Sequence, residues 1–153
     1  MVFATPTTDL AASYIAREVI LPSGAYDTAS AYGIIQAPPN ANVKVQSIAC
    51  YGSTSSATDY VQFILLPPSL NADATGMVKI GDPGNGSYLC IEGFGFGGAT
   101  YTAANAMNLT IPAGWTLAVR WATAATLSTD CAFNAVGIYD YSIQTLNFSS
   151  RGM

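Results

Sequence analysis

The 153-residue sequence contains no histidine and few charged side chains. Without imidazole, the chain cannot form most nucleophilic triads, proton shuttles or histidine-based metal sites. Its 5 lysines and arginines and 9 aspartates and glutamates make up 9% of the residues, compared with about 25% in an ordinary soluble domain. Five scattered cations cannot build the basic stripe that neutralises phosphates, so we expect no nucleic-acid partner. A surface this weakly charged favours burial in an assembly; the alternative is a protein that works outside the crowded cytosol with a neutral Ser/Thr surface.

Signals for export and for membrane insertion are also missing. The opening residues MVFATPTTDL lack a basic start and a long apolar run before Asp9, which predicts no secretory signal. No stretch of about 18 consecutive apolar residues occurs, so we expect no membrane partner.

The three cysteines, Cys50, Cys90 and Cys131, each lie within an apolar, strand-like segment. An odd number of cysteines without CxxC spacing argues against a disulfide framework and against a zinc site. The pattern favours three buried, reduced thiols, while a bridge between two of them stays open. We expect no cofactor.

Apolar and polar side chains alternate through most of the chain, which is the period of a half-buried strand. The segment WTLAVRW, residues 115–121, places both tryptophans with Leu117 and Val119 on one face. Turns rich in proline and glycine separate such segments, and Ile111-Pro112-Ala113-Gly114 matches a type I turn. The pattern predicts strands at residues 18–21, 31–37, 43–51, 58–66, 77–81, 87–93, 106–111, 115–122 and 130–143.

This spacing predicts an all-β fold, an antiparallel jelly-roll-like β-sandwich of eight or nine strands. The length fits one domain with one core. We expect an N-terminal arm at residues 1–17, the sandwich at 18–146 and a C-terminal tail at 147–153. The arm has one alternative, a short helix from Asp9 to Arg17 with Asp9 as its N-cap.

One segment is similar to a calcium-binding loop. Asn71, Asp73 and Thr75 carry oxygens at alternate positions, a glycine follows, and Asp82 lies eleven residues after Asn71. However, Asp82 replaces the longer glutamate that would bind calcium through two oxygens, and Lys79 occupies the ninth position. An ordinary polar connection between strands is the preferred interpretation, so we expect no metal.

Four acids, Asp59, Glu92, Asp130 and Asp140, could supply the carboxylate pair of a glycoside hydrolase. Most of them lie near predicted strand ends, where solvated turn residues are the simpler interpretation, so we expect no enzymatic activity. The tyrosines and both tryptophans could form a sugar-binding platform, but core packing explains the alternating tryptophans more simply.

The predicted interaction residues are mostly aromatic. Phe94 and Phe96 lie in the glycine-rich segment GFGFGG, a flexible loop whose rings could anchor on a neighbour or turn into the chain's own core. Arg120 faces away from the tryptophans, where it would extend to solvent or pair at an interface. The full predicted interface set is Phe3, Tyr14, Phe94, Phe96, Arg120, Tyr139 and Tyr141.

Three segments carry a resemblance to a known group of proteins. The segment LTIPAGWTLAVRWAT, residues 109–123, resembles the strand–turn–strand hairpin of jelly-roll viral structural proteins. The segments VKVQSIACYG, residues 43–52, and YVQFILLPP, residues 60–68, resemble the earlier paired strands of such folds. Together with the charge-poor composition, they make the chain similar to virion proteins of tailed bacteriophages, especially capsid decoration or cement proteins.

This resemblance implies a homo-oligomer, commonly a trimer, that binds the major capsid protein of a phage head. It also implies assembly in the host cytoplasm and a final location in the virion. The alternative is a carbohydrate- or receptor-binding β-sandwich, such as a fibre tip or a lectin-like module.

Overall fold

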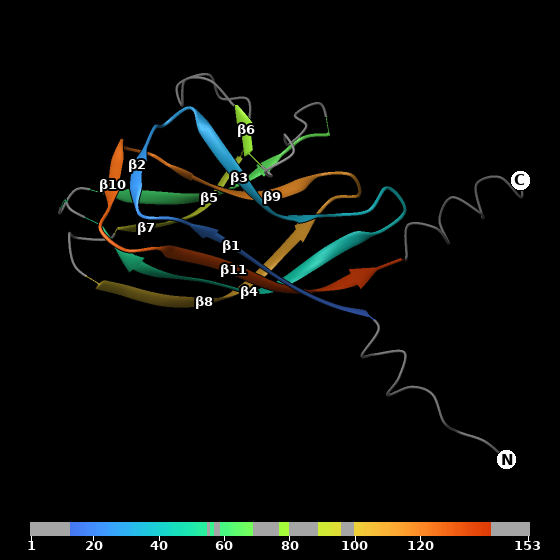
Figure 1. Ribbon diagram of the computed structural model, residues 1–153. Helices are drawn as coiled ribbons and strands as arrows, with labels where there is room; N and C mark the ends of the chain where they lie inside the picture. The colour runs from blue at the N-terminus through green and yellow to red at the C-terminus, as the bar shows by residue number, and fades with distance from the viewer. Residues whose placement is uncertain are drawn as a thin grey trace, which may run out of the picture.

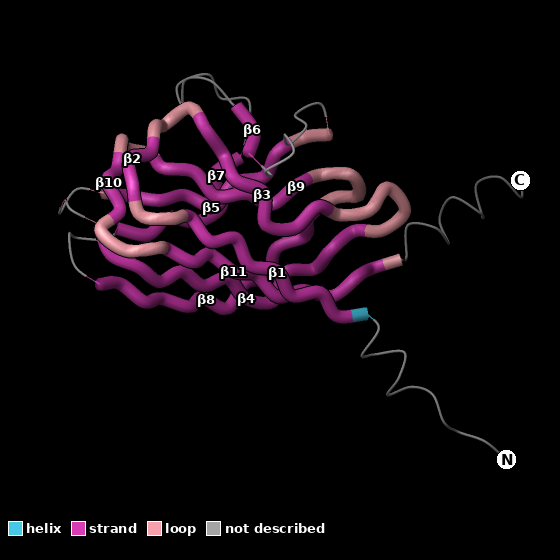
Figure 2. Tube along the Cα trace, viewed as in Figure 1, coloured by secondary structure: helices cyan, strands magenta, loops and turns pink. Residues whose placement is uncertain are grey.

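The computed structural model describes residues 13–54, 56, 59–68, 77–79, 89–95 and 100–141, with side chains described for 13–54, 56, 59–68 and 108–141. Most of these residues are in strands, which short loops connect (Figure 2). No helix in this part of the chain is long and apolar enough to cross a membrane. The strands are β1 (Tyr14–Leu21), β2 (Gly24–Tyr26), β3 (Ser30–Gln36), β4 (Asn42–Ser53), β5 (Tyr60–Leu66), β6 (Met77–Lys79), β7 (Leu89–Gly95), β8 (Thr100–Ile111), β9 (Thr116–Trp121), β10 (Ala125–Leu127) and β11 (Cys131–Asp140).

The first five strands pair with the last five in reverse order. β1 pairs with β11, β2 with β10, β3 with β9, β4 with β8 and β5 with β7, and every pair is antiparallel. The chain is therefore one long antiparallel ribbon, and β6 lies in the connection at its tip. The ribbon folds back on itself because β11 also pairs with β4 and β9 also pairs with β5. This arrangement is a jelly roll, which confirms the predicted fold class.

The folded ribbon has two main layers. One layer is a four-stranded sheet in the order β1-β11-β4-β8, which we name the β4 sheet. The other is a five-stranded sheet in the order β6-β3-β9-β5-β7, which we name the β9 sheet. The two sheets lie face to face, with the short β2–β10 pair at one end of the sandwich (Figure 1).

The inner faces of the two sheets form an aromatic core. Trp121, Phe133 and Phe63 are fully buried there. The ring centroid of Phe133 lies 6.1 Å from that of Trp121 and 6.3 Å from that of Phe63, both in edge-to-face geometry. Each such pair contributes about 0.5–1.5 kcal/mol beyond the area that it buries. Leu117 and Val119 point into the same core, so the predicted alternation of β9 is confirmed.

A β-bulge at Gln46 keeps both halves of β4 facing the core. The buried residues of β4 lie at odd positions up to Val45 and at even positions from Ile48 to the end of the strand. In the ladder with β11, Val45 and Ser47 lie opposite neighbouring residues, so Gln46 is the extra residue. One inserted residue exchanges the two faces of a strand, and this bulge therefore keeps the second half of β4 in the core.

The outer faces of the two sheets differ in burial. On the β9 sheet, a second apolar cluster is fully buried: Ala31, Ile64, Leu66 and Ala118 are each 0% exposed. On the β4 sheet, by contrast, Ile20 is 52% exposed and Tyr51 is 46% exposed. The fold therefore covers most of the outer face of one sheet, apart from Tyr60, and leaves the other open.

The sandwich begins earlier than the sequence predicted. β1 pairs with β11 from Tyr14 onward, so residues 14–17 belong to a sheet and not to an arm. A helix over these residues is wrong, because pairing with β11 satisfies their backbone groups and buries Ile15. Residues 1–12 and 147–153, which make up the rest of the predicted arm and the predicted tail, lie outside the described residues.

Two other elements differ from the sequence-based prediction. β2 and β10, each three residues long, do not follow from the alternation of side chains. The segment 93–95 was expected in a flexible loop but forms the end of β7, where Phe94 lies opposite Val61 of β5. The loop prediction fails there because a neighbouring strand supplies ladder hydrogen bonds that outweigh the low strand preference of glycine.

The turn between β8 and β9 lies one residue later than predicted and has a different type. The Trp115 N–H donates to the Pro112 carbonyl at 3.0 Å, and Gly114 has a φ of +82°. A positive φ at the third residue defines a type II turn, for which glycine is the favoured residue. The Gly114 N–H also donates to the Ala37 carbonyl at 3.1 Å, which ties this turn to the end of β3.

We expect Gly52→Ala to lower the free energy of unfolding by about 1–3 kcal/mol more than Gly24→Ala does. The two glycines have similar φ angles, +153° and +147°, so the backbone strain of an alanine is matched. A methyl group at Gly52 would overlap the sulfur of Cys131, whereas nothing lies within 4 Å of the same position at Gly24. Urea unfolding of both variants measures the difference, and equal losses would contradict this packing.

Candidate interaction surfaces

The outer side of the β4 sheet is a candidate interaction surface. Side chains of a strand alternate between its two faces, and cross-strand partners share a face. We name this outer surface the β4 face. Its described side chains that are exposed or half-exposed include Tyr14, Ala16, Glu18, Ile20, Asn42, Lys44, Ser47, Ala49, Tyr51, Thr110, Asn134, Val136, Ile138 and Asp140.

The β4 face is apolar for a surface in contact with solvent. Tyr14 and Ile20, at opposite ends of β1, are 51% and 52% exposed. Ile20 lies in one cross-strand row with Ala132 and Tyr51, which is 46% exposed. A shallow depression over β1 and β11 lies around the small side chain of Ala16. Contiguous exposed apolar surface of this kind marks interaction sites more often than scattered single residues do.

The described side chains of the β4 face include three charges: Glu18 on β1, Lys44 on β4 and Asp140 at the end of β11. The Lys44 Nζ lies 3.3 Å from Oδ2 of Asp140 at the end of β11. The lysine side chain is 63% exposed, and an ion pair in such a setting contributes about 0–1 kcal/mol. Lys44 can therefore turn toward a partner carboxylate at little loss to the fold.

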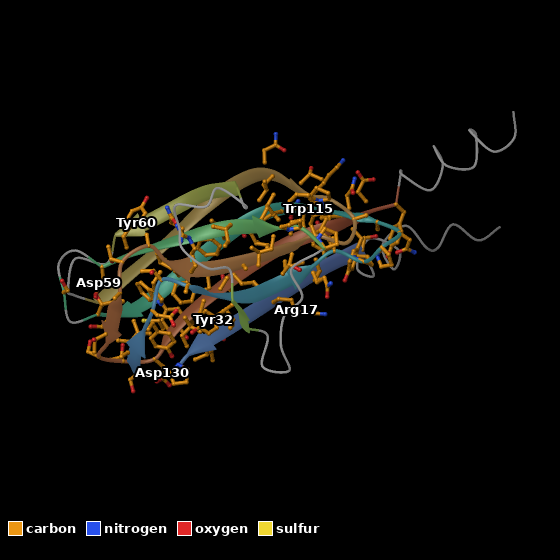
Figure 3. The ribbon with its side chains drawn as sticks, turned by 90° about the horizontal axis from the view of Figure 1, so that it is seen from above. Arg17, Tyr32, Asp59, Tyr60, Trp115 and Asp130 are labelled. Atoms are coloured by element: carbon orange, nitrogen blue, oxygen red, sulfur yellow. The ribbon has the colours of Figure 1, made fainter. Side chains whose placement is uncertain are left out.

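Arg17 lies at the free edge of β1. Arg17 lies on the same side of β1 as the core residue Ile15, but its side chain is exposed. Its Nη1 donates to the Ala16 carbonyl at 2.9 Å. Figure 3 shows this side chain at the margin of the sandwich. A charge that points inward from an edge strand opposes the addition of another strand to the sheet.

Arg120 is held inside this chain. It lies on the side of β9 opposite Trp121, as the alternation predicted, but it is only 5% exposed. Its Nε and Nη2 donate to the Gln62 Oε1 at 2.9 and 2.5 Å, across the ladder between β9 and β5. Arg120 therefore contributes to the covered outer side of the β9 sheet.

Three of the predicted aromatic interaction residues have described side chains. Tyr14 and Tyr141 are exposed, and Tyr139 is half-buried against the core. The ring centroids of Tyr139 and Tyr141 lie 6.0 Å apart, with the ring planes 36° from parallel. Tyr14 belongs to the β4 face, whereas the other two tyrosines follow the core-facing alternation at the end of β11. The remaining aromatic predictions have no described side chain: Phe3, Phe94 and Phe96.

The acidic residues occupy separate structural positions. Asp130 Oδ1 accepts the Ser23 N–H at 2.9 Å, and Asp140 belongs to the ion pair described above. Asp59 is 2% exposed and lies next to Tyr60, apart from Asp130 at the same end of the sandwich (Figure 3). The structure describes Glu92 only as backbone in β7.

The predicted calcium-like segment lies mostly outside the described residues. This applies to Asn71, Asp73, Thr75 and Asp82. Among the residues that are described, no group of three or more histidine, cysteine, aspartate and glutamate side chains is placed to hold a metal ion.

Cys50 and Cys131 are buried thiols that form no disulfide, as the cysteine pattern favours. Burial raises the pKa of the Cys131 thiol above its ordinary value, a backbone hydrogen bond with Ser53 acts against this, and the charge of Asp130 adds to it. Burial likewise raises the pKa of Tyr26, with smaller contributions from Cys131 and Asp130. Since the thiolate is the nucleophile, a raised pKa lowers the fraction of Cys131 that can react at neutral pH.

Comparison with known proteins finds structural neighbours but no sequence relatives. No protein-family model and no curated protein matches the chain. Eiger TNF from S. frugiperda has a TM-score of 0.46 and 10% identity, over 82% of this chain and 92% of that chain. The capsid of Helicobacter pylori bacteriophage KHP30 has a TM-score of 0.35 and 9% identity, over 82% and 87%. The cyanophage Pam1 capsid has a TM-score of 0.37 and 15% identity, over 83% and 84%.

The structural neighbours thus include phage capsid proteins. Jelly rolls also occur in lectins and cupins, so the fold is compatible with several functions. The surfaces of this chain must therefore carry any functional conclusion.

We expect the free energy of unfolding to fall as the pH rises above the ordinary pKa of a thiol. The raised pKa of Cys131 means that the unfolded chain loses this proton first, so the stability present below that pH is lost as the pH rises through the pKa of the folded state. Urea unfolding of the wild type and of Cys131→Ala between neutral and alkaline pH measures the effect. The variant should show a weaker pH dependence, and parallel curves would contradict the burial of a titrating thiol.

Proposed function

We propose that this protein is a non-enzymatic structural component of a phage virion, a decoration or cement protein that reinforces the head. The observation that carries the proposal is the β4 face, an exposed and largely uncharged sheet surface. A free domain with 9% charged residues has little electrostatic repulsion to keep copies apart, so an assembled state suits both features.

The proposed mechanism is the addition of contact area. Each copy would bury apolar and Ser/Thr surface against the major capsid protein and against other copies, and so hold neighbouring capsomers together. A homo-oligomer on a repeating lattice binds through several sites at once, which raises its avidity without strong single contacts. The resemblance implies a trimer, and the mass of the protein in solution tests that number.

The contact with the capsid would come from two regions. The first is the arm, now limited to residues 1–12 because Tyr14 is already paired in β1. The second is the tyrosine pair at the end of β11, where Tyr141 is 48% exposed beside Tyr139. Aromatic side chains of this kind are enriched at the energetic centres of interfaces.

The absence of catalysis is part of the proposal. Two of the candidate carboxylates have structural partners, since Asp130 accepts a backbone N–H and Asp140 pairs with a lysine, while the third, Asp59, is buried with its Oδ2 outside any hydrogen bond. A glycoside hydrolase needs two carboxyl groups about 5–9.5 Å apart in a cleft. These three acids come from separate strand ends, which favours a structural over a catalytic role.

We expect deletion of residues 1–12 to leave the unfolding midpoint unchanged and to weaken binding to undecorated phage heads by at least about tenfold. The deletion ends before β1, so the sheet keeps all its strands. Cosedimentation of purified protein with heads of the phage that encodes it measures binding. A chain that lacks residues 147–153 is the matched control.

Normal binding by the shortened chain would exclude the arm as the capsid contact. A stable monomer that binds glycans and is absent from particles would overturn the proposed function and support the carbohydrate-binding alternative. Loss of that glycan binding in EDTA would in addition point to the calcium-like segment.

A further inference from the structure

The outer faces of the two sheets differ in how far their side chains are exposed to solvent. On the β9 sheet, even the charged side chain of Arg120 is 5% exposed, and the apolar residues around it are fully buried. On the β4 sheet, three large side chains remain about half-exposed: Tyr14, Ile20 and Tyr51. The chain therefore covers most of one outer face by its own folding, with Tyr60 as an exposed exception, and leaves the other for a partner.

The size of the β4 face fits a protein–protein contact. Four strands spaced by about 4.8 Å are about 19 Å wide, and eight residues at about 3.4 Å each are about 27 Å long. The flat area is about 500 Å² per copy, so two copies would bury about 1,000 Å² before the relief of the side chains is counted. A specific interface needs about 1,000 Å² or more in total.

The charges of the β4 face are self-complementary. Glu18 lies in the middle of β1 at one edge of the sheet, and Lys44 lies on an inner strand in the row of Tyr14. A two-fold axis midway between Glu18 and Lys44 would place each Glu18 near the Lys44 of the other copy, where it would join Asp140 beside the same lysine. A contact between identical surfaces needs this kind of complementarity.

The same charges oppose the other way in which two copies could associate. If β1 added to β1 of a second copy as one continuous antiparallel sheet, residues of the same parity would lie opposite each other. The two longest such pairings place Arg17 opposite Arg17 or Glu18 opposite Glu18. Like charges directly opposite are destabilising, so contact through the face is favoured over contact through the edge.

We propose that the β4 face binds the β4 face of a second copy of this chain across a two-fold axis. This inference deepens the homo-oligomer of the proposed function and names its surface. It also makes the number of copies even, because a two-fold contact gives a dimer, or a hexamer if each copy also belongs to a trimer. The capsid contact through residues 1–12 and the tyrosine pair remains separate.

The test compares Tyr51→Lys with Tyr60→Lys in the full chain without particles. Both tyrosines are exposed strand residues, 46% and 39%, but Tyr60 lies on the β9 sheet. Sedimentation equilibrium should give a dimer or hexamer for the wild type and for Tyr60→Lys. For Tyr51→Lys it should give half that mass, with the dissociation constant raised by at least about tenfold.

Glu18→Lys is a second variant at an exposed edge position, where the fold should tolerate the change. It should raise the dissociation constant, because two lysines would then face each other at each pair. Circular dichroism and thermal unfolding verify that each variant is folded.

A monomeric or trimeric wild type would overturn the proposal, as would an unchanged mass in both Tyr51→Lys and Glu18→Lys. Equal dissociation by Tyr60→Lys would also overturn it, because the effect would not be specific to the β4 face. Particle binding is not part of this measurement, so self-association can succeed where decoration of the capsid fails, and the two results are distinguishable.

Discussion

Two stacked sheets have four faces, and only two of these can cover each other. The inner pair forms the aromatic core around Trp121 and Phe133. The chain itself buries the apolar side chains on the outer face of the β9 sheet, since Ile64 and Leu66 are fully buried there. The β4 sheet does not, and the exposed positions of Ile20 and Tyr51 are the consequence. The unequal covering of the two outer faces links the fold to the assembly that we propose.

The ribbon topology supplies part of the hydrogen bonding of Arg120, which lies among apolar side chains. Burying a guanidinium is costly unless its hydrogen bonds are satisfied. Cross-strand pairing places Gln62 directly opposite Arg120, and the amide oxygen accepts two of its N–H groups. A chain with only five cations therefore uses one of them for structure on the covered face.

The sequence predicted the long strands well, because each has one buried face and therefore a period of two, as Leu117 and Val119 illustrate. It could not predict β2 and β10, since three residues are too short to show a period. Tyr14 and its neighbours were assigned to an arm because the pattern of an edge strand is weak when both of its sides are partly exposed. The β4 face was missed for a related reason. This face depends on the order of strands in the sheet, which is determined by pairing between segments far apart in the sequence. The sequence shows the alternation from Tyr14 to Ile20 but not which strands lie beside it.

The position of the few charges separates two kinds of association that an exposed sheet invites. Open edges lead to continuous sheets and aggregation, whereas an open face leads to a closed pair. On β1, Arg17 and Glu18 lie where edge-to-edge pairing would bring like charges together. The centre of the face, around Ala49 and Val136, carries no charge. Scarcity of charge would make a random surface adhesive in all directions. In this chain, the charges of β1 oppose pairing through the edge, and the centre of the face carries none, so the same scarcity favours a defined interface.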